Sequence, residues 1–329
     1  MDPCVGPSGA PQMNTDISGI GVRVSFYLQT LFLSCLCARS GSPDEIAGAL
    51  YTLLFTNTAM AVTALILGFQ PNPEITFHDG LIVFYLLNLS WVTVYFSLPA
   101  VAKSPNVKLL YIFSILQSYT IFAFAFAMLI TAHSFGQHSQ CNHHASIVIF
   151  RPFHALPAGR IVCLVVTAVI FTLYTGMLIK DNLPPAPKRI LQWIQQKVTK
   201  EVPTTAEQEL PPPPGAPPLP RHAPQKLSAG KVEYHARKAP TVPKEYDLQI
   251  AWNIVIEIFV VLILWGMAVM NTELLIRWNH FPPSNGQSLW QFGQVLPMFL
   301  VVLPLTNLIT AFRDLGLRPL PMRPVISKA

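Results

Sequence analysis

The sequence predicts an all-α protein, a polytopic bundle of seven transmembrane helices with one long disordered Pro-rich cytoplasmic loop. Apolar residues make up 51% of the chain and charged residues only 12%, about half the charged fraction of a soluble protein. The apolar residues gather in seven runs, each long enough to cross a hydrocarbon core of about 30 Å as a helix. The runs are continuously apolar, whereas the strands of a membrane barrel alternate polar and apolar residues.

The seven spans are expected at 18–38, 46–69, 77–101, 107–132, 158–180, 248–271 and 287–312. Residues 1–17 are polar and acidic, so we expect an extracellular tail without a cleavable signal peptide. The first span then acts as its own insertion signal. Residues 313–329 are expected to form a cytoplasmic tail.

Basic residues predict the orientation of the bundle. The N-terminal tail and the 70–76 loop contain no Lys or Arg, and the 272–286 loop contains only Arg277. The 181–247 segment contains ten. Because cytoplasmic segments carry an excess of Lys and Arg, the N-terminus is expected outside and the C-terminus inside, at the plasma membrane. The net charge of +6 is therefore a topology signal, and we expect the lipid bilayer as a partner and no nucleic acid.

Cysteine placement agrees with this orientation. Cys35, Cys37 and Cys163 fall inside spans, where a free thiol behaves as a small apolar group. Cys4 and Cys141 both fall on the expected outer face, which is the oxidising side. We therefore predict a Cys4–Cys141 disulfide, with two unpaired thiols in loops as the alternative.

The 181–247 segment is rich in proline and basic residues, which predicts a cytoplasmic linker with disordered, polyproline II character. Within it, 188–199 carries an apolar stripe flanked by Lys and Arg. This pattern is typical of an amphipathic helix on the inner membrane surface. A helical extension of the fifth span is the alternative.

The same linker contains two short patterns for adaptor docking. Pro217, Pro218, Leu219 and Pro220 resemble a WW-domain ligand, and 210–214 resembles an EVH1 ligand. A preformed polyproline II segment loses little entropy when it binds an aromatic groove. A cytosolic WW- or EVH1-type partner is therefore one interpretation, and a stiff spacer is the other.

Polar residues inside spans are the candidate sites, because an acid at the bilayer centre costs about 2.5–3.5 kcal/mol. Glu257 is the one acid well inside a span, and Asn253 lies one helical turn from it. The functional hypothesis is a proton, cation or ligand site. The structural alternative is an interhelical hydrogen bond to Asn57, Asn88 or Gln117.

A second candidate lies at the outer end of the first span and is formed by Asp16 and Arg23. These residues are two helical turns apart and so share one face. They predict an ion pair or anion site at the outer end of the bundle, or alternatively an anchor for the start of the helix.

The seventh span contains Pro297 and Pro304, which are predicted to kink it. Gln291 and Gln294 are expected to face the bundle interior. Transporters build binding sites from broken helices, but kinked helices also occur in passive bundles.

Histidines gather in the 133–157 loop, where His138, His143 and His144 lie near Cys141. Neutral imidazoles bind Zn²⁺ or Cu²⁺, so these three are weak metal candidates. Their spacing matches no closed site, and we expect no metal and no cofactor.

The layout of the chain is similar to that of a G-protein-coupled receptor, but the motifs differ. The chain reads Phe96-Ser-Leu-Pro-Ala100 where an Asp/Glu-Arg-Tyr motif would follow span three, and the seventh span has no lysine for retinal. Residues 16–29, 158–160 and 271–280 resemble a group of uncharacterised fungal multi-span membrane proteins. That resemblance implies the architecture and no particular activity.

A receptor or sensor is the favoured function class, because of the topology and the long inner segment. The alternatives are a small-molecule or proton-coupled transporter, and a membrane-embedded enzyme such as a terpene cyclase or lipid hydrolase. An enzyme would need clustered acids, and Asp16, Asp79 and Glu273 are the three that could converge at the outer rim. No catalytic residue is assigned.

Overall fold

A computed structural model of the protein describes Cys4 and residues 12–40, 42–102, 107–182, 252–279 and 292–317. The chain divides into two compact units, one formed by 1–175 with 248–329 and the other by 176–247. Only residues 176–182 of the second unit are described. The predictions for the Pro-rich linker, the 188–199 helix, the 217–220 motif and Gln291 therefore lie outside the described residues.

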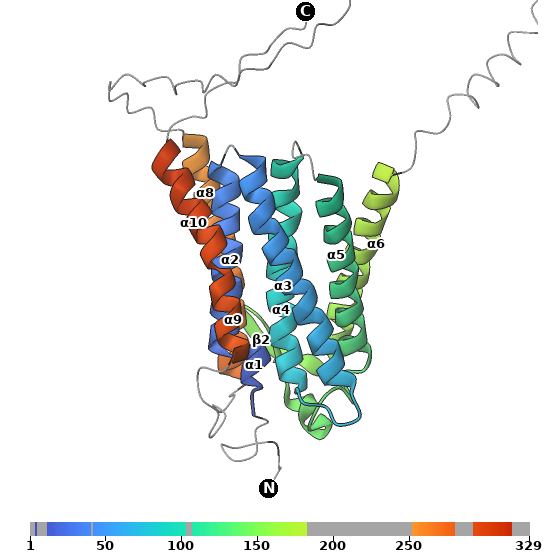
Figure 1. The fold of residues 1–329 in the computed structure, drawn as a ribbon. Coiled ribbons are helices and arrows are strands. Elements are labelled where there is room, and N and C mark those ends of the chain that lie inside the picture. The colour runs from blue at the N-terminus through green and yellow to red at the C-terminus, as the bar shows by residue number, and fades with distance from the viewer. Residues whose placement is uncertain are drawn as a thin grey trace, which may run out of the picture. The chain divides into compact units, whose positions relative to one another are not determined.

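Seven helical spans in the described residues are long and apolar enough to cross a membrane. They are α1 with α2 (Thr15–Ser18, Ile20–Arg39), α3 (Pro43–Phe69), α4 with the 3₁₀ turn η1 (Phe77–Ser97, Leu98–Val101), α5 (Val107–Ile130), the wide turn η3 with α6 (Ala155–Gly159, Arg160–Asn182), α8 (Trp252–Trp278), and α9 with α10 (Phe292–Leu300, Val302–Leu315). Figure 1 shows these helices. The prediction of a seven-helix membrane bundle is confirmed.

Successive helices run in opposite directions, which gives the bundle two ends (Figure 1). One end, here called the disulfide end, contains Thr15, Phe69, Phe77, Ile130, Arg160, Trp278 and Phe292. The other, called the Arg39 end, contains Arg39, Pro43, Val101, Val107 and Leu315. At this second end the Arg39 side chain is buried and donates a hydrogen bond to the Gly316 carbonyl, which joins α2 to the end of α10.

Two hydrophobic cores fill the bundle, one toward each end. The core at the disulfide end includes Phe26, Phe77, Leu87 and Phe124. The core at the Arg39 end is formed by Leu33, Leu36, Leu50, Leu54, Val94, Val101 and Leu110, with further apolar neighbours. Large apolar side chains on the outer faces are half exposed, as lipid-facing helices require.

The sixth span differs from its predicted boundaries, because α8 ends at Trp278 instead of residue 271. Thr272 and Leu275 are buried against the bundle, and the carboxylate of Glu273 pairs with Arg23. Tertiary contacts therefore keep helical a polar stretch that the hydropathy pattern places in a loop.

The 133–157 loop contains a hairpin that an all-α prediction omits. Strands β1 (Ser146–Ile149) and β2 (Arg151–His154) pair antiparallel. Ile147 and Val148 of β1 are buried, consistent with the preference of β-branched residues for strands. The seventh span is interrupted at Val301, between Pro297 and Pro304, as the two prolines predict.

The predicted disulfide is confirmed. Cys4 is bonded to Cys141, with a Cα–Cα distance of 5.4 Å. Cys141 belongs to the 3₁₀ turn η2 (Ser139–His144), so the bond fastens the N-terminal tail to this loop. Cys35, Cys37 and Cys163 are free, as expected for thiols inside spans.

Helix α2 approaches α9 closely at Gly21, where a Cβ atom would meet the Cβ of Gln294 at 2.8 Å. We expect Gly21→Ala to lower the free energy of unfolding by about 1–2 kcal/mol, because α9 must move away. Equilibrium unfolding in mixed micelles measures this change. Gly266→Ala is the control, since no atom lies within 4 Å of its added Cβ. An equal response of both variants would contradict the close packing.

Candidate functional site

A cleft separates α6 from α8, because each helix packs on a different neighbour. Phe171 of α6 packs edge-on against Tyr119, Phe122 and Phe126 of α5, with ring centroids 5.4–5.9 Å apart. On the other side, the Trp265 indole of α8 donates a 2.9 Å hydrogen bond to the carbonyl of Tyr27 on α2. Helix α4 forms the wall between them.

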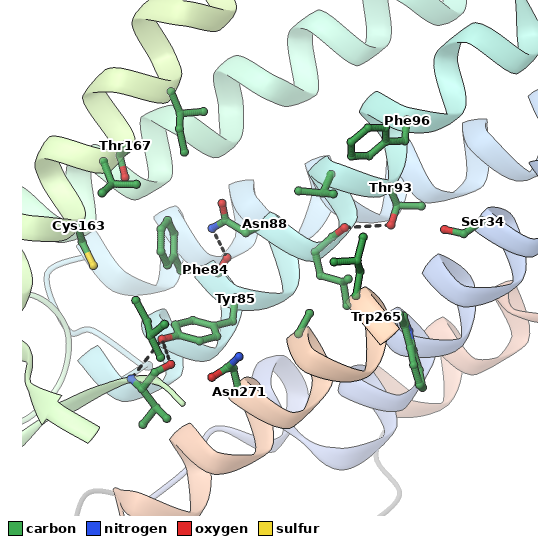
Figure 2. Close-up of a pocket in the computed structure, with 18 of the residues that line it drawn as sticks. Ser34, Phe84, Tyr85, Asn88, Thr93, Phe96, Cys163, Thr167, Trp265 and Asn271 are labelled. Atoms are coloured by element: carbon green, nitrogen blue, oxygen red, sulfur yellow. Dashed lines mark hydrogen bonds between the residues drawn. The ribbon is translucent and has the colours of Figure 1, made fainter. Parts of the chain in front are cut away.

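The cleft has a volume of about 840 Å³ and an almost entirely apolar lining. Figure 2 shows side chains from α2, α4, α6 and α8 around this space. Phe96, Leu264 and Val166 line it and are 72%, 56% and 50% exposed. The cleft is therefore open at the lipid-facing surface, and its volume is within the range of small-molecule sites.

Most polar groups of the lining already have partners. The Tyr85 hydroxyl donates to the Val148 carbonyl at 2.8 Å and accepts from the Val148 amide at 3.2 Å (Figure 2). Asn271 accepts from the Phe150 amide at 2.7 Å and donates within its own helix. Asn88 donates to the Phe84 carbonyl at 2.7 Å. These bonds position the walls and leave few polar groups for a ligand.

Glu257 is the exception, and among the lining residues that the structure describes it is the one acidic or basic side chain. Among the described residues no hydrogen bond or ion pair to its carboxylate is found. Cys37 of α2 lines the same cleft. The predicted bonds to Asn57, Asn88 or Gln117 are not formed, so the structure places this acid where the cleft contents would meet it.

The other predicted site residues lie elsewhere. Asn253 is exposed in the first turn of α8 and does not line the cleft. Gln294 is buried between helices, where its side-chain oxygen accepts from the Gly21 amide at 3.3 Å. The structure therefore does not bring Glu257 and the seventh span together in one cavity.

Arg23 belongs to a separate polar cluster near the disulfide end. Its Nη1 contacts both carboxylate oxygens of Glu273 at 2.7 Å, and the Tyr27 hydroxyl donates to the same carboxylate at 2.9 Å. The Arg23 side chain is 9% exposed and that of Glu273 is 48% exposed. The ion pair joins α2 to α8, so the guanidinium already has a counter-charge.

Asp79 and Asp16 also have packing roles at this end. The fully buried Asp79 carboxylate accepts from the Asn14 amide, the Ser18 hydroxyl, and the amide and hydroxyl of Thr76. Asp16 lies against Gly293, where an added Cβ would meet its Oδ1 at 2.7 Å. The three acids of the enzyme hypothesis thus lie at one end without lining the cleft.

The histidines of the 133–157 loop, predicted as weak metal candidates, do not form a site with Cys141. His143 and His144 have ring centroids 4.0 Å apart, and His138 precedes η2. Cys141 is in the disulfide. In the part of the chain that the structure describes, no group of three potential metal ligands is found.

Several cleft residues were missed by the sequence reasoning, above all Tyr85, Trp265 and Asn271. Tyr and Trp inside spans carry polar atoms that need partners, and that requirement could have marked the first two. Asn271 was placed at the end of its span because the predicted boundary was seven residues short.

Comparisons with protein-family models, curated proteins and solved structures give no match to this chain. The fold defines it as a multi-pass α-helical membrane protein, and an apolar cleft opens at the surface of its helices.

Proposed function

We propose that this protein is a receptor or sensor for a lipophilic amine that enters from the bilayer. The observation that carries the proposal is the cleft between α6 and α8, with Glu257 as the one acidic side chain among its described lining residues. A sensor needs a site that its ligand can reach, and this one opens toward lipid.

The chemistry of the lining selects the ligand class. An apolar cleft of about 840 Å³ accommodates an alkyl chain or fused rings. An unpaired carboxylate in a low-dielectric environment has a high free-energy cost, and a cationic head group offsets that cost. A long hydrophobic body with an amine at one end satisfies both parts of the site.

The orientation supports a signalling role. A disulfide forms on an oxidising face, so the disulfide end is assigned to the outside of the plasma membrane and the Arg39 end to the cytoplasm. The 181–247 segment then lies inside the cell, where its WW- and EVH1-like motifs would bind adaptors.

A photoactivatable long-chain alkyl amine tests the proposal, with the protein held in lipid nanodiscs. Mass spectrometry of the adducts is expected to place them on α4, α6 and α8. Glu257→Gln is expected to reduce amine labelling about tenfold, equivalent to about 1.4 kcal/mol. Labelling by the matched alcohol should change little, because it lacks the charge.

Two tryptophan variants on α8 separate site binding from general lipid contact. Ala268→Trp fills the cleft and should block both probes, since Ala268 lines it. Gly266→Trp adds the same side chain at a position outside the lining, with no atom within 4 Å of its Cβ. Equal labelling of the two variants would show that the cleft is not the site.

A proton-coupled transporter is the second candidate, because Glu257 faces the cleft and the seventh span is interrupted at Val301. However, no residue of α9 or α10 lines the cleft. Flux of the amine across liposomes that is lost in Glu257→Gln would favour the transporter over the sensor.

A further inference from the structure

A layer of polar side chains crosses the middle of the bundle, between its two hydrophobic cores. The layer, here called the central polar layer, consists of Gln29 on α2, Asn57 on α3, Ser90 on α4 and Gln117 on α5. On α3 the core of the Arg39 end stops at Leu54, and the core of the disulfide end starts at Ala61. On α4 the Arg39-end core stops at Val94 and the disulfide-end core starts at Leu87. On α5 the same two limits are Leu110 and Ile121. Each gap contains one member of the layer.

The members lie at the same depth. Measured from the disulfide end, Asn57 is 12 residues before Phe69, Ser90 is 13 after Phe77, and Gln117 is 13 before Ile130. At about 1.5 Å per residue this depth is about 18–20 Å, near the centre of a bilayer.

A separate comparison places Gln29 at the same depth as Ser90. The bond from the Ser18 hydroxyl to Asp79 fixes the relative height of the first and third spans. Gln29 is 11 residues beyond Ser18, and Ser90 is 11 residues beyond Asp79. The helices that carry these residues pack directly on one another, since α3 contacts α4 and α5, and α2 contacts α3 and α4.

These side chains are buried and largely unpaired. Gln29 is 2% exposed and the other three are fully buried. Within the described residues, both amide atoms of Asn57 and Gln117, the Ser90 hydroxyl and the Gln29 oxygen have no hydrogen-bond partner. Only the Gln29 nitrogen has one, the Pro297 carbonyl at 3.4 Å. In a membrane interior each unsatisfied group costs several kcal/mol.

We propose that the central polar layer is a binding site for a cluster of ordered water molecules at the middle of the membrane. The unpaired set contains donors, the two amide nitrogens, as well as acceptors. A cation could bind only the oxygens and would meet no carboxylate within this set. Water both donates and accepts, and a buried water typically makes about three hydrogen bonds to such groups.

The direct test is a high-resolution structure of the full-length protein in lipid nanodiscs. We expect water-sized density within about 2.7–3.2 Å of the Asn57 and Gln117 amides. Amides bonded directly to each other, with no density between them, would overturn the proposal.

A second measurement separates water from a bound cation and needs no variant. The thermal unfolding midpoint is compared in sodium, potassium and choline chloride at equal ionic strength. Equal midpoints are expected for a water site, and a midpoint raised by one cation alone would identify an ion site. Radiolytic labelling provides a third readout, with the flanking Leu87 and Ile121 expected to react and the equally buried Phe77 to stay unmodified.

Discussion

Replacing Asp79 with alanine is expected to lower the free energy of unfolding by about 3–5 kcal/mol. The Asp79 carboxylate is fully buried and accepts four hydrogen bonds, two from Thr76 and one each from Asn14 and Ser18. The substitution removes the acceptor of four donors, of which the Ser18 hydroxyl keeps a second acceptor, the Asn14 carbonyl. It also removes the capping box of α4. It therefore weakens the helix start and its link to the first span together.

Equilibrium unfolding in mixed micelles measures the Asp79→Ala effect, and Asp314→Ala is the matched control. Asp314 has an exposed side chain whose partner is its neighbour Arg313, and such surface pairs contribute about 0–1 kcal/mol. A loss below about 1 kcal/mol for Asp79→Ala would mean that the carboxylate is not the junction between these helices.

Glu273→Gln is expected to lower the free energy of unfolding by about 2–3 kcal/mol. The change removes the charge that balances Arg23, whose side chain is 9% exposed. Breaking a buried ion pair typically costs 3–5 kcal/mol because one charge is left uncompensated. The effect is smaller here because the Glu273 side chain is half exposed and water screens it.

A double substitution distinguishes the cost of an unpaired charge from the loss of the pair itself. Arg23→Met with Glu273→Leu removes both charges and should recover most of the stability that Glu273→Gln loses. If the double variant is as unstable as the single one, the ion pair contributes through its own attraction, and the buried arginine is not the cause.

The number and place of the membrane spans could be predicted from the sequence, since the length and continuity of apolar runs report directly on burial in lipid. The predicted ends of the helices are less accurate where packing contacts, and not hydropathy, determine where a helix ends. The end of α8 is the clearest example, because Glu273 and Thr272 are polar and yet belong to the helix. The β1–β2 hairpin depends on pairing of two four-residue segments, which is too short a pattern to recognise.

The site was predictable only in part, because it depends on which helices become neighbours. The sequence points to Glu257, because an acidic side chain inside a membrane has a high free-energy cost. It does not predict the cleft around Glu257, because α4, α6 and α8 are distant in sequence. Helical spacing predicts Asp16 as the ion-pair partner of Arg23. In the structure Arg23 pairs with Glu273, which is 250 positions away in the sequence. The Thr76 and Asp79 spacing of a capping box was visible in the sequence and could have identified that junction.

The central claim is that the chain crosses the membrane seven times and places the disulfide end and the Arg39 end on opposite faces. Epitopes inserted after Pro71, in the loop between α3 and α4, and after Ser40, in the turn between α2 and α3, test it by protease protection in sealed vesicles. We predict that one epitope is digested and the other protected, with the pattern reversed in inverted vesicles. Digestion of both, or protection of both, would contradict the seven-span arrangement.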